Sequence, residues 1–194
     1  MLKNLIHYYA NVSDMALNNL KNEKRFQFKK HLTNHSLLKV VESHYEKITN
    51  SVEAKKMIAD YMARMNGMTN TSKDSYNKTL ALVKATTDPV AKQRIIDTYA
   101  EKGIHGFTAK NGAHWNIETY SNMVTTHFNN ELVRLSVMET LKPESKVLIS
   151  QHAKACPLCI PYEGLILTLP EMEEAKQAGL YHVRCKHFFT EVVP

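Results

Sequence analysis

Two short clusters, His152-Ala-Lys-Ala-Cys156-Pro-Leu-Cys159 and His182-Val-Arg-Cys185-Lys-His187, decide the fold of the C-terminal part of this chain. All three cysteines of the protein lie in these clusters. A Cys-x2-Cys spacing lets both sulfur atoms of a tight turn, called a knuckle, point at one ion, and a second knuckle supplies the remaining ligands. The two clusters therefore predict a four-coordinate zinc site.

The clusters offer more ligands than a tetrahedral ion needs, and we predict the set Cys156, Cys159, Cys185 and His187. Cys185 and His187 are two residues apart, so their side chains share one face of an extended segment. His182 is the main alternative for the fourth place. His152 is a weaker alternative, because three residues separate it from the first knuckle. A histidine left out of the metal shell can still hydrogen-bond to a ligand.

Two other interpretations of the cysteines are weaker. Reduced structural cysteines beside unrelated histidines would suit a lone Cys-x2-Cys, but here His-x2-Cys-x-His follows it. A thioredoxin-like redox motif needs a βαβ context and no second cluster. The odd number of cysteines argues against a disulfide framework.

Length and composition suit one ordinary domain, or a helical part plus a small metal-bound part, since the chain has 194 residues, 43% of them hydrophobic. The N-terminal sequence lacks the apolar core of a secretory signal, and no apolar run approaches the ~20 residues of a membrane-spanning helix. We therefore expect synthesis in a reducing cytoplasm and no membrane partner. The net charge of +6 permits contact with nucleic acid or an acidic protein and proves neither.

Residues 1–102 show the periodicity of a helical region. Apolar residues between Leu5 and Leu20 recur at three- and four-residue steps, and a broad apolar stripe over residues 36–66 predicts one long helix or two. Asn66-Gly67 predicts a helix end, and the polar residues 69–75 predict a loop before a helix over about 74–85.

Sequence signals for helix starts, helix ends and turns are frequent after residue 85. Asp88-Pro89 predicts the start of a helix that ends at Gly103. Asn111-Gly112 then predicts a tight hairpin turn in which both residues have positive φ. Three apolar side chains are expected to pack on the inner side of this hairpin: Phe107, Trp115 and Ile117.

The remaining pattern predicts a long helix over about 118–140, a strand at 146–150, a strand at 164–169, a short helix at 171–178 and a strand at 188–193. We therefore expect an α+β fold: a mostly helical N-terminal part, residues 1–102, and a small mixed α/β module, residues 103–194. The module consists of the hairpin, the long helix and the knuckle-type zinc site.

A basic stretch, Lys21 to Lys30, contains two interleaved aromatic residues, Phe26 and Phe28. One interpretation is a surface that contacts nucleic acid or another protein. The other, which we favour, is a solvated helix end whose two aromatic side chains pack into the core.

The order of motifs in the C-terminal half resembles a known family. The resemblance is carried by Gly106-Phe107-Thr108 through Trp115, by Tyr120-Ser-Asn-Met123-Val124, by Ser150-x-His152-x3-Cys156-Pro-Leu-Cys159-x2-Tyr162-Glu163-Gly164, and by Glu174-Ala175-x2-Ala178-Gly179-Leu180-Tyr181-His182-x2-Cys185-Lys186-His187. This order is similar to that of the phage minor capsid proteins, which are related to the Mu F-like head morphogenesis proteins of tailed phages. The resemblance covers about residues 103–194.

Two positions depart from the family pattern. Val183 stands where the family usually has proline, and Lys186 stands where it usually has arginine. Both changes leave the cysteine and histidine positions intact. In related sequences the last ligand position is cysteine or histidine, which supports His187 as a ligand.

The resemblance implies a structural role and no catalysis. Such proteins are present in few copies in the procapsid, associate with the portal vertex and act in head assembly, in some cases with effects on DNA packaging or ejection. It implies portal and capsid proteins as partners, a place in the virion at the capsid interior or portal vertex, and zinc as a staple. Contact with packaged DNA through the basic stretch stays open.

A metal-dependent nuclease or toxin-like enzyme is the first alternative function. Glu163 lies four residues after Cys159, near enough to approach the metal as a general base. The signature of the zinc deaminases is absent, because His-Ala-Lys-Ala and not His-x-Glu precedes Cys156.

A zinc-stabilised nucleic-acid-binding module is the second alternative. Basic and acidic residues near the knuckles nearly balance: Lys154, Lys176, Arg184 and Lys186 against Glu163, Glu171, Glu173, Glu174 and Glu191. A dedicated nucleic-acid surface needs a basic excess, so this balance argues against it.

Overall fold

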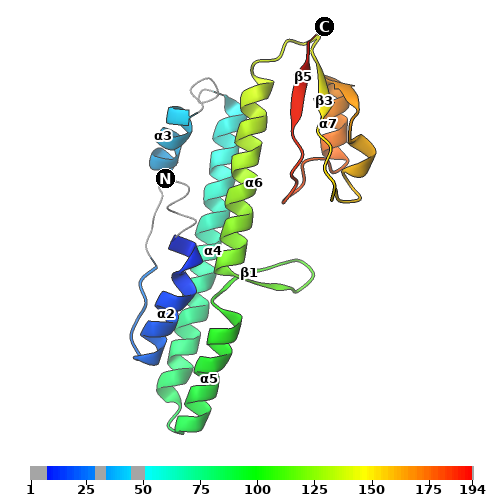
Figure 1. Ribbon diagram of the computed structural model, residues 1–194. Helices are drawn as coiled ribbons and strands as arrows, with labels where there is room; N and C mark the ends of the chain where they lie inside the picture. The colour runs from blue at the N-terminus through cyan, green and yellow to red at the C-terminus, as the bar shows by residue number, and fades with distance from the viewer. Residues whose placement is uncertain (1–7, 29–33, 45–50, 194) are drawn as a thin grey trace. The chain divides into compact units, whose positions relative to one another are not determined.

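The computed structural model describes residues 8–28, 34–44 and 51–193 (Figure 1). These residues form a mixed α+β structure, which confirms the predicted class. Leu5, Lys29 and Lys30 lie outside the described residues. Among the described residues, every helix is too short or too polar to cross a membrane.

The chain divides into two compact units. One comprises residues 1–40 and 56–125, and the other comprises residues 41–55 and 126–194. This division does not coincide with the boundary near residue 102 that the sequence indicated. The predicted boundary separates a helical region from the knuckle module, and it stays a prediction.

Helices α2 (Val12–Lys21) and α5 (Pro89–Lys102) pack against each other in the first unit. Helix α2 buries Val12, Ala16 and Leu20, which confirms the predicted apolar face. Helix α5 begins and ends where the sequence predicted. The Asp88 carboxylate accepts hydrogen bonds from the backbone N–H groups of Val90 and Ala91, and Gly103 ends the helix with a φ of 68°.

The apolar stripe over residues 36–66 belongs to two helices, α3 (Asn34–His44) and α4 (Val52–Ala85). The predicted helix end at Asn66-Gly67 and the predicted loop at 69–75 are wrong, because α4 continues through both. Met68 and Ser72 are buried along this stretch, and packing of this face outweighs the weak helix propensity of Gly67. Gly67 itself is exposed, with no atom within 4 Å of the place of a Cβ.

The predicted hairpin is confirmed as β1 (His105–Thr108) paired with β2 (His114–Asn116). Its turn differs from the prediction. The Gly112 N–H donates to the Ala109 carbonyl, and of the two turn residues only Gly112 has a positive φ, 81°. A three-residue loop of this kind needs one left-handed residue, whereas the expected two-residue turn needs two.

The side chains predicted to pack on the hairpin differ in burial. Ile117 is fully buried, whereas Phe107 remains exposed and stacks on Tyr120 with ring centroids 4.4 Å apart. Gly106 lies so close to the helix that follows that a Cβ there would be 2.7 Å from the Ile117 Cα. The hairpin therefore meets the start of α6 (Ile117–Met138) by backbone contact.

The second unit contains an antiparallel sheet of three strands in the order β4-β3-β5. These are β3 (Lys146–Ile149), β4 (Ile166–Thr168) and β5 (Phe189–Val192). Helix α7 (Leu169–Gln177) starts with a capping box between Thr168 and Glu171. The three predicted strands and the short helix are thereby confirmed, and β4 is shorter than the predicted strand at 164–169.

One apolar core unites the sheet, α7 and the knuckles of the second unit. It contains Val147, Ile149, Cys159, Met172, Ala175, Leu180, Tyr181, Cys185 and Phe189. Alternate residues of β3 point into this core, as expected for a sheet with one covered face. Two of the three cysteines are therefore core residues as well as candidate ligands.

Substitution of two glycines tests the continuity of α4 and the contact of the hairpin with α6. Gly67→Ala is expected to raise the free energy of unfolding by about 0.5–1 kcal/mol, because glycine in a helix interior is less stable than alanine. Gly106→Ala is expected to lower it by about 1–3 kcal/mol, because the added methyl group overpacks against Ile117. Urea denaturation followed by circular dichroism measures both. Destabilisation by Gly67→Ala would contradict a continuous α4.

Candidate metal centre

The first knuckle is a tight turn between β3 and β4. The N–H of Cys159 donates to the carbonyl of Cys156 at 2.9 Å, and the N–H of Ile160 donates to the same carbonyl at 3.1 Å. A 3-10 helix, η2 (Ile160–Tyr162), follows directly. This backbone arrangement places both sulfur atoms on one side of the turn, as the Cys-x2-Cys spacing predicted.

The second knuckle is a turn that leads into β5. The N–H of Cys185 donates to the carbonyl of His182 at 2.8 Å. Tyr181 and Arg184 have positive φ values of 64° and 70°. Each such residue costs on the order of 1–3 kcal/mol and persists only where the surrounding structure fixes it. The second knuckle is therefore held in a backbone conformation that its own sequence does not favour.

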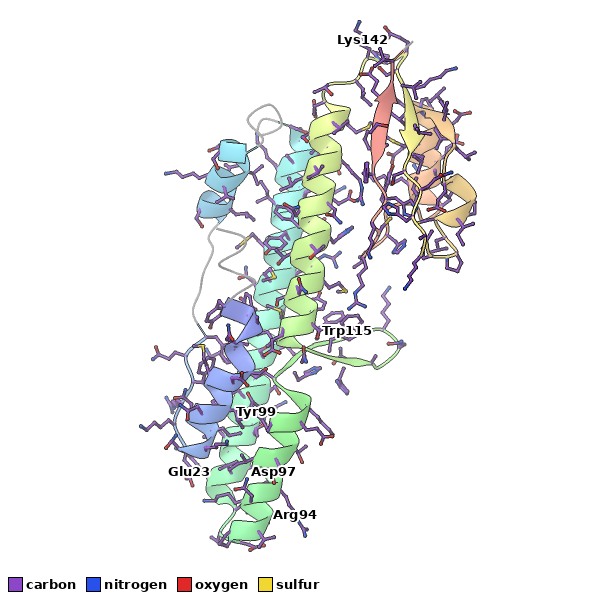
Figure 2. The ribbon with its side chains drawn as sticks, viewed as in Figure 1. Glu23, Arg94, Asp97, Tyr99, Trp115 and Lys142 are labelled. Atoms are coloured by element: carbon purple, nitrogen blue, oxygen red, sulfur yellow. The ribbon has the colours of Figure 1, made fainter. Side chains whose placement is uncertain are left out.

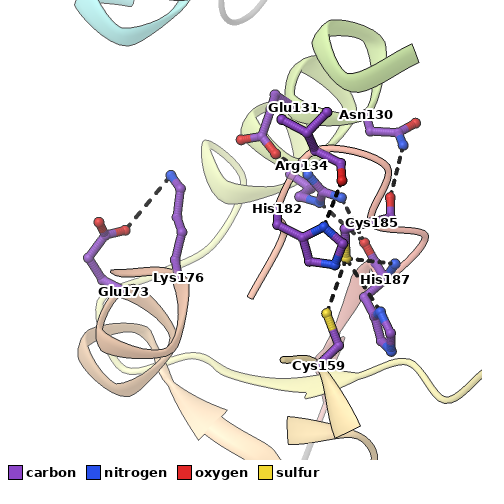
Figure 3. A network of polar contacts seen from close by, with 10 residues as sticks. Asn130, Glu131, Arg134, Cys159, Glu173, Lys176, His182, Cys185 and His187 are labelled. Carbon is purple, nitrogen blue, oxygen red and sulfur yellow. Dashed lines mark hydrogen bonds and ion pairs between the residues drawn. The ribbon is translucent and has the colours of Figure 1, made fainter. Parts of the chain in front are cut away.

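Five candidate ligands lie in two overlapping groups. Within each group the ligand atoms lie within 4.8 Å of one another. The groups are Cys156, Cys159 and His182, and Cys159, Cys185 and His187. Figure 3 shows four of these side chains converging from the two knuckles. The five residues are thus placed to hold a metal ion, and Cys159 is common to both groups.

Two distances in the deeper group match a tetrahedral site. The sulfur atoms of Cys159 and Cys185 are 3.6 Å apart, and the Cys185 sulfur is 3.4 Å from His187 Nδ1. Ligands at bond lengths of about 2.3 Å for sulfur and 2.0–2.1 Å for nitrogen would be about 3.5–3.8 Å apart on a tetrahedral zinc. The residues present therefore fit this ion.

The outer pair is closer together. The Cys156 sulfur lies 2.8 Å from His182 Nε2, which is shorter than the edge of about 3.5 Å between sulfur and nitrogen ligands on a tetrahedral zinc. His182 Nδ1 donates to the carbonyl of Val183 at 2.6 Å, which turns Nε2 towards the Cys156 sulfur. His182 thus has the orientation of a ligand and lies close to the thiol.

His187 is oriented by a carboxylate. Its Nε2–H donates to Glu163 Oε1 at 2.8 Å, and Nδ1 is left facing the Cys185 sulfur. Glu163 Oε1 also accepts the backbone N–H of His152 at 2.6 Å. These two hydrogen bonds, that from His187 first, hold the pKa of the Glu163 carboxyl below its usual range. A histidine that donates one ring nitrogen to a carboxylate and offers the other to a metal is a recurrent metal-site arrangement.

His152 lies outside both ligand groups. Its Nε2 is 3.0 Å from the Ser150 hydroxyl, and its ring packs edge-on against His187 with centroids 4.7 Å apart. The side chain therefore supports His187, while its backbone N–H binds Glu163. The hydrogen bond from such a histidine to a ligand, which the sequence left open, is not seen here: His152 bonds to Ser150 and Glu163 instead.

The pKa values of the Cys156 and Cys159 thiols depend on neighbouring thiols. Burial, together with hydrogen bonds to Cys156 and Cys185, raises the pKa of the Cys159 thiol to about 12. Burial also opposes ionisation of Cys156, but hydrogen bonds involving Cys159 and His182 outweigh it and lower the pKa of this thiol. A divalent cation favours thiolate at every sulfur that it binds and releases the protons.

Helix α6 fixes the second knuckle through two polar side chains that the sequence did not reveal. Asn130 Nδ2 donates to the carbonyl of Cys185 at 3.2 Å. Arg134 donates from Nε and Nη2 to the carbonyl of His187 at 3.2 and 3.0 Å (Figure 3). Arg134 also pairs with Glu131 and lies over the Tyr181 ring, 4.2 Å from its centroid. No spacing rule links residues so far from the knuckles in sequence.

Comparison with known proteins identifies the family. The profile of phage minor capsid protein 2 matches residues 9–194, nearly the whole chain. The chain therefore belongs to this family of phage structural head proteins. The match extends the resemblance from the C-terminal module to the helices before residue 103. No curated protein and no solved structure shows a significant match.

Two histidine substitutions test which imidazole completes the site. His187→Ala is expected to lose bound metal, because it removes the buried ring nitrogen of a candidate ligand, whereas His152→Ala is expected to keep the metal. The metal content per chain after gel filtration is measured for both variants. His182→Ala, measured in the same way, tests the alternative fourth ligand. Loss of metal in His152→Ala and retention in His187→Ala would overturn the assignment.

Proposed function

We propose that this chain is a minor head protein of a tailed phage in which a zinc ion staples the two knuckles together. Membership of the minor capsid family supports the role in the head. The observation that carries the structural role of the metal is the arrangement of His187, which is 3% exposed between the Cys185 thiol and the Glu163 carboxylate. A buried ligand held by its own carboxylate suits a closed, structural site.

The proposed ligands are Cys156, Cys159, Cys185 and His187, with His182 as the alternative fourth ligand. Cys159, Cys185 and His187 are all at most 3% exposed. Sulfur and imidazole donors in a tetrahedral arrangement favour zinc over the harder cations, which prefer oxygen. The gain in stability from such an ion suits a unit whose core is small.

The alternative of a metal-dependent nuclease is less well supported. A catalytic zinc needs an open coordination position and a base that is free to take a proton. Glu163, the carboxylate considered for this role, binds the ring of His187 and the backbone of His152. Its geometry suits the orientation of a ligand, so we assign it a positioning role.

We further propose that the protein acts in head assembly, at the capsid interior or the portal vertex, with the portal and capsid proteins as partners. The family supports a place in the virion, and the helical unit offers surface for such contacts. The zinc module has little net charge around it, and Lys176 lies 4.0 Å from Glu173. That balance does not favour the alternative of a nucleic-acid-binding zinc module.

Elemental analysis tests the metal and its effect on stability. Purified protein is expected to hold about one zinc ion per chain, as a closed tetrahedral site requires. Cys156→Ser is expected to lose this zinc, and a chelator is expected to lower the melting temperature of the wild-type protein. Ala155→Ser, next to Cys156, is the control. It is expected to keep the zinc ion and the wild-type response of the melting temperature to a chelator. Protein without metal under reducing conditions, or a melt unchanged by chelation, would contradict the staple.

Cross-linking in purified phage heads tests the proposed place in the particle. The protein is expected in mature heads at a copy number well below that of the major capsid protein, with cross-links to the portal protein. Its absence from heads, or cross-links confined to the major capsid lattice, would contradict the portal assignment. Metal-dependent cleavage of DNA that Glu163→Gln abolishes would support the nuclease instead.

A further inference from the structure

A groove of about 1070 Å³ opens in the first unit, between α4 and the extended residues 24–28. Its walls are held together by two contacts. The Tyr76 hydroxyl donates to the carbonyl of Lys24 at 2.6 Å, and the Phe26 ring packs 5.8 Å from the Tyr76 ring. The aromatic residues of the basic stretch therefore pack on α4, as the favoured interpretation of the sequence expected, and they leave a recess beside them.

The lining of this groove is cationic. Arg25 lies on the extended wall, and Lys73 and Lys84 lie on α4. All three are exposed, and among the described residues no carboxylate lines the groove. Within the described part of the chain, none of the three forms a salt bridge.

Two carboxylates lie near the groove and do not neutralise it. Glu23, which Figure 2 labels, lies near Lys84, but its carboxylate forms an ion pair with Lys92 Nζ at 2.7 Å. Asp74 follows Lys73 on α4, so its side chain points about 100° away around the helix. The groove therefore keeps an excess of positive charge.

The helical wall of the groove carries a stripe of amides as well as cations. The stripe consists of Asn66, Asn70, Lys73, Asn77 and Lys84. Successive positions are separated by four, three, four and seven residues, so they share one face of α4 over about 27 Å. Amide and ammonium groups both donate hydrogen bonds, and phosphate oxygens accept them. A row of donors with a net positive charge suits an extended anion with repeating phosphates.

We infer that this groove binds the phosphodiester backbone of a nucleic acid strand, with Arg25, Lys73 and Lys84 contacting phosphates and the asparagines donating to phosphate oxygens. The ligand is recognised by its charge and spacing, so binding is independent of base sequence. Phe26, Phe28 and Leu80 also line the groove, so the preference for a phosphate backbone over an acidic peptide rests on the row of hydrogen-bond donors along α4. The inference does not rest on the zinc site or on the place of the protein in the head.

Fluorescence anisotropy with a labelled, short single-stranded DNA of mixed sequence tests the inference on the full chain. With three phosphate contacts, the affinity is expected to fall roughly 20-fold between 50 and 200 mM salt. The triple variant Arg25→Gln, Lys73→Gln and Lys84→Gln is expected to reduce the slope of log K against log salt by about 2.

A second triple variant is a matched control. It combines Arg94→Gln on α5 (Figure 2) with Lys56→Gln and Lys78→Gln on α4. Like the groove variant, it removes one arginine and two lysine charges, but from exposed positions outside the groove. This variant is expected to keep the wild-type affinity and salt slope. An equal loss in both triple variants would show diffuse charge attraction and overturn the inference.

Two further results would also overturn it: no DNA binding at 50 mM salt, or tighter binding of poly-glutamate, lost in the groove variant alone. Where a variant does not fold, acetylation of the lysines in the wild-type protein, with and without DNA, tests the inference instead. DNA is expected to slow acetylation of Lys73 and Lys84 and to leave Lys56 and Lys78 unaffected. Equal protection of all four lysines would contradict a site in the groove. None of these readouts depends on bound zinc or on portal binding.

Discussion

The hydrogen bond between the His187 ring and the Glu163 carboxylate is the constraint on which the metal centre depends. It turns Nδ1 of His187 towards Cys185, and the same carboxylate binds the backbone of His152 at the start of the first knuckle. One side chain thereby ties both knuckles together without a metal. An ion placed among the sulfur atoms would then meet ligands that are already oriented, which lowers the cost of ordering them.

Helix α6 supplies the second constraint on this centre. The second knuckle includes two non-glycine residues with positive φ, Tyr181 and Arg184, so its backbone must be held from outside. Arg134 and Asn130 do this by donating to the carbonyls of His187 and Cys185. Burial of the Arg134 charge is offset by these bonds, by Glu131 and by the Tyr181 ring. Two of the candidate ligands, Cys159 and Cys185, are thus part of the core of the second unit.

Local signals in the sequence were reliable where the chemistry is local. Asp88 and Gly103 bound α5, and Asn111-Gly112 marks the hairpin, because caps and turns depend on a few neighbouring atoms. The helix end predicted at Gly67 is wrong because tertiary packing, and not a local signal, decides whether α4 continues. A glycine in a helix costs only about 1 kcal/mol, which the burial of a neighbouring side chain such as Met68 outweighs. The exact type of the hairpin turn also escaped prediction, since Asn-Gly suits turns of either length.

The sequence by itself determined which side chains are candidate ligands, the order of the elements that carry them and the family resemblance, because spacing along the chain fixes all three. Only the tertiary structure decided how these side chains are used. It gave His187 a carboxylate partner, placed His152 beside that ring, and brought Asn130 and Arg134 to the second knuckle. These contacts join residues far apart in sequence, and their distances depend on how the sheet and helices pack, which no local pattern encodes.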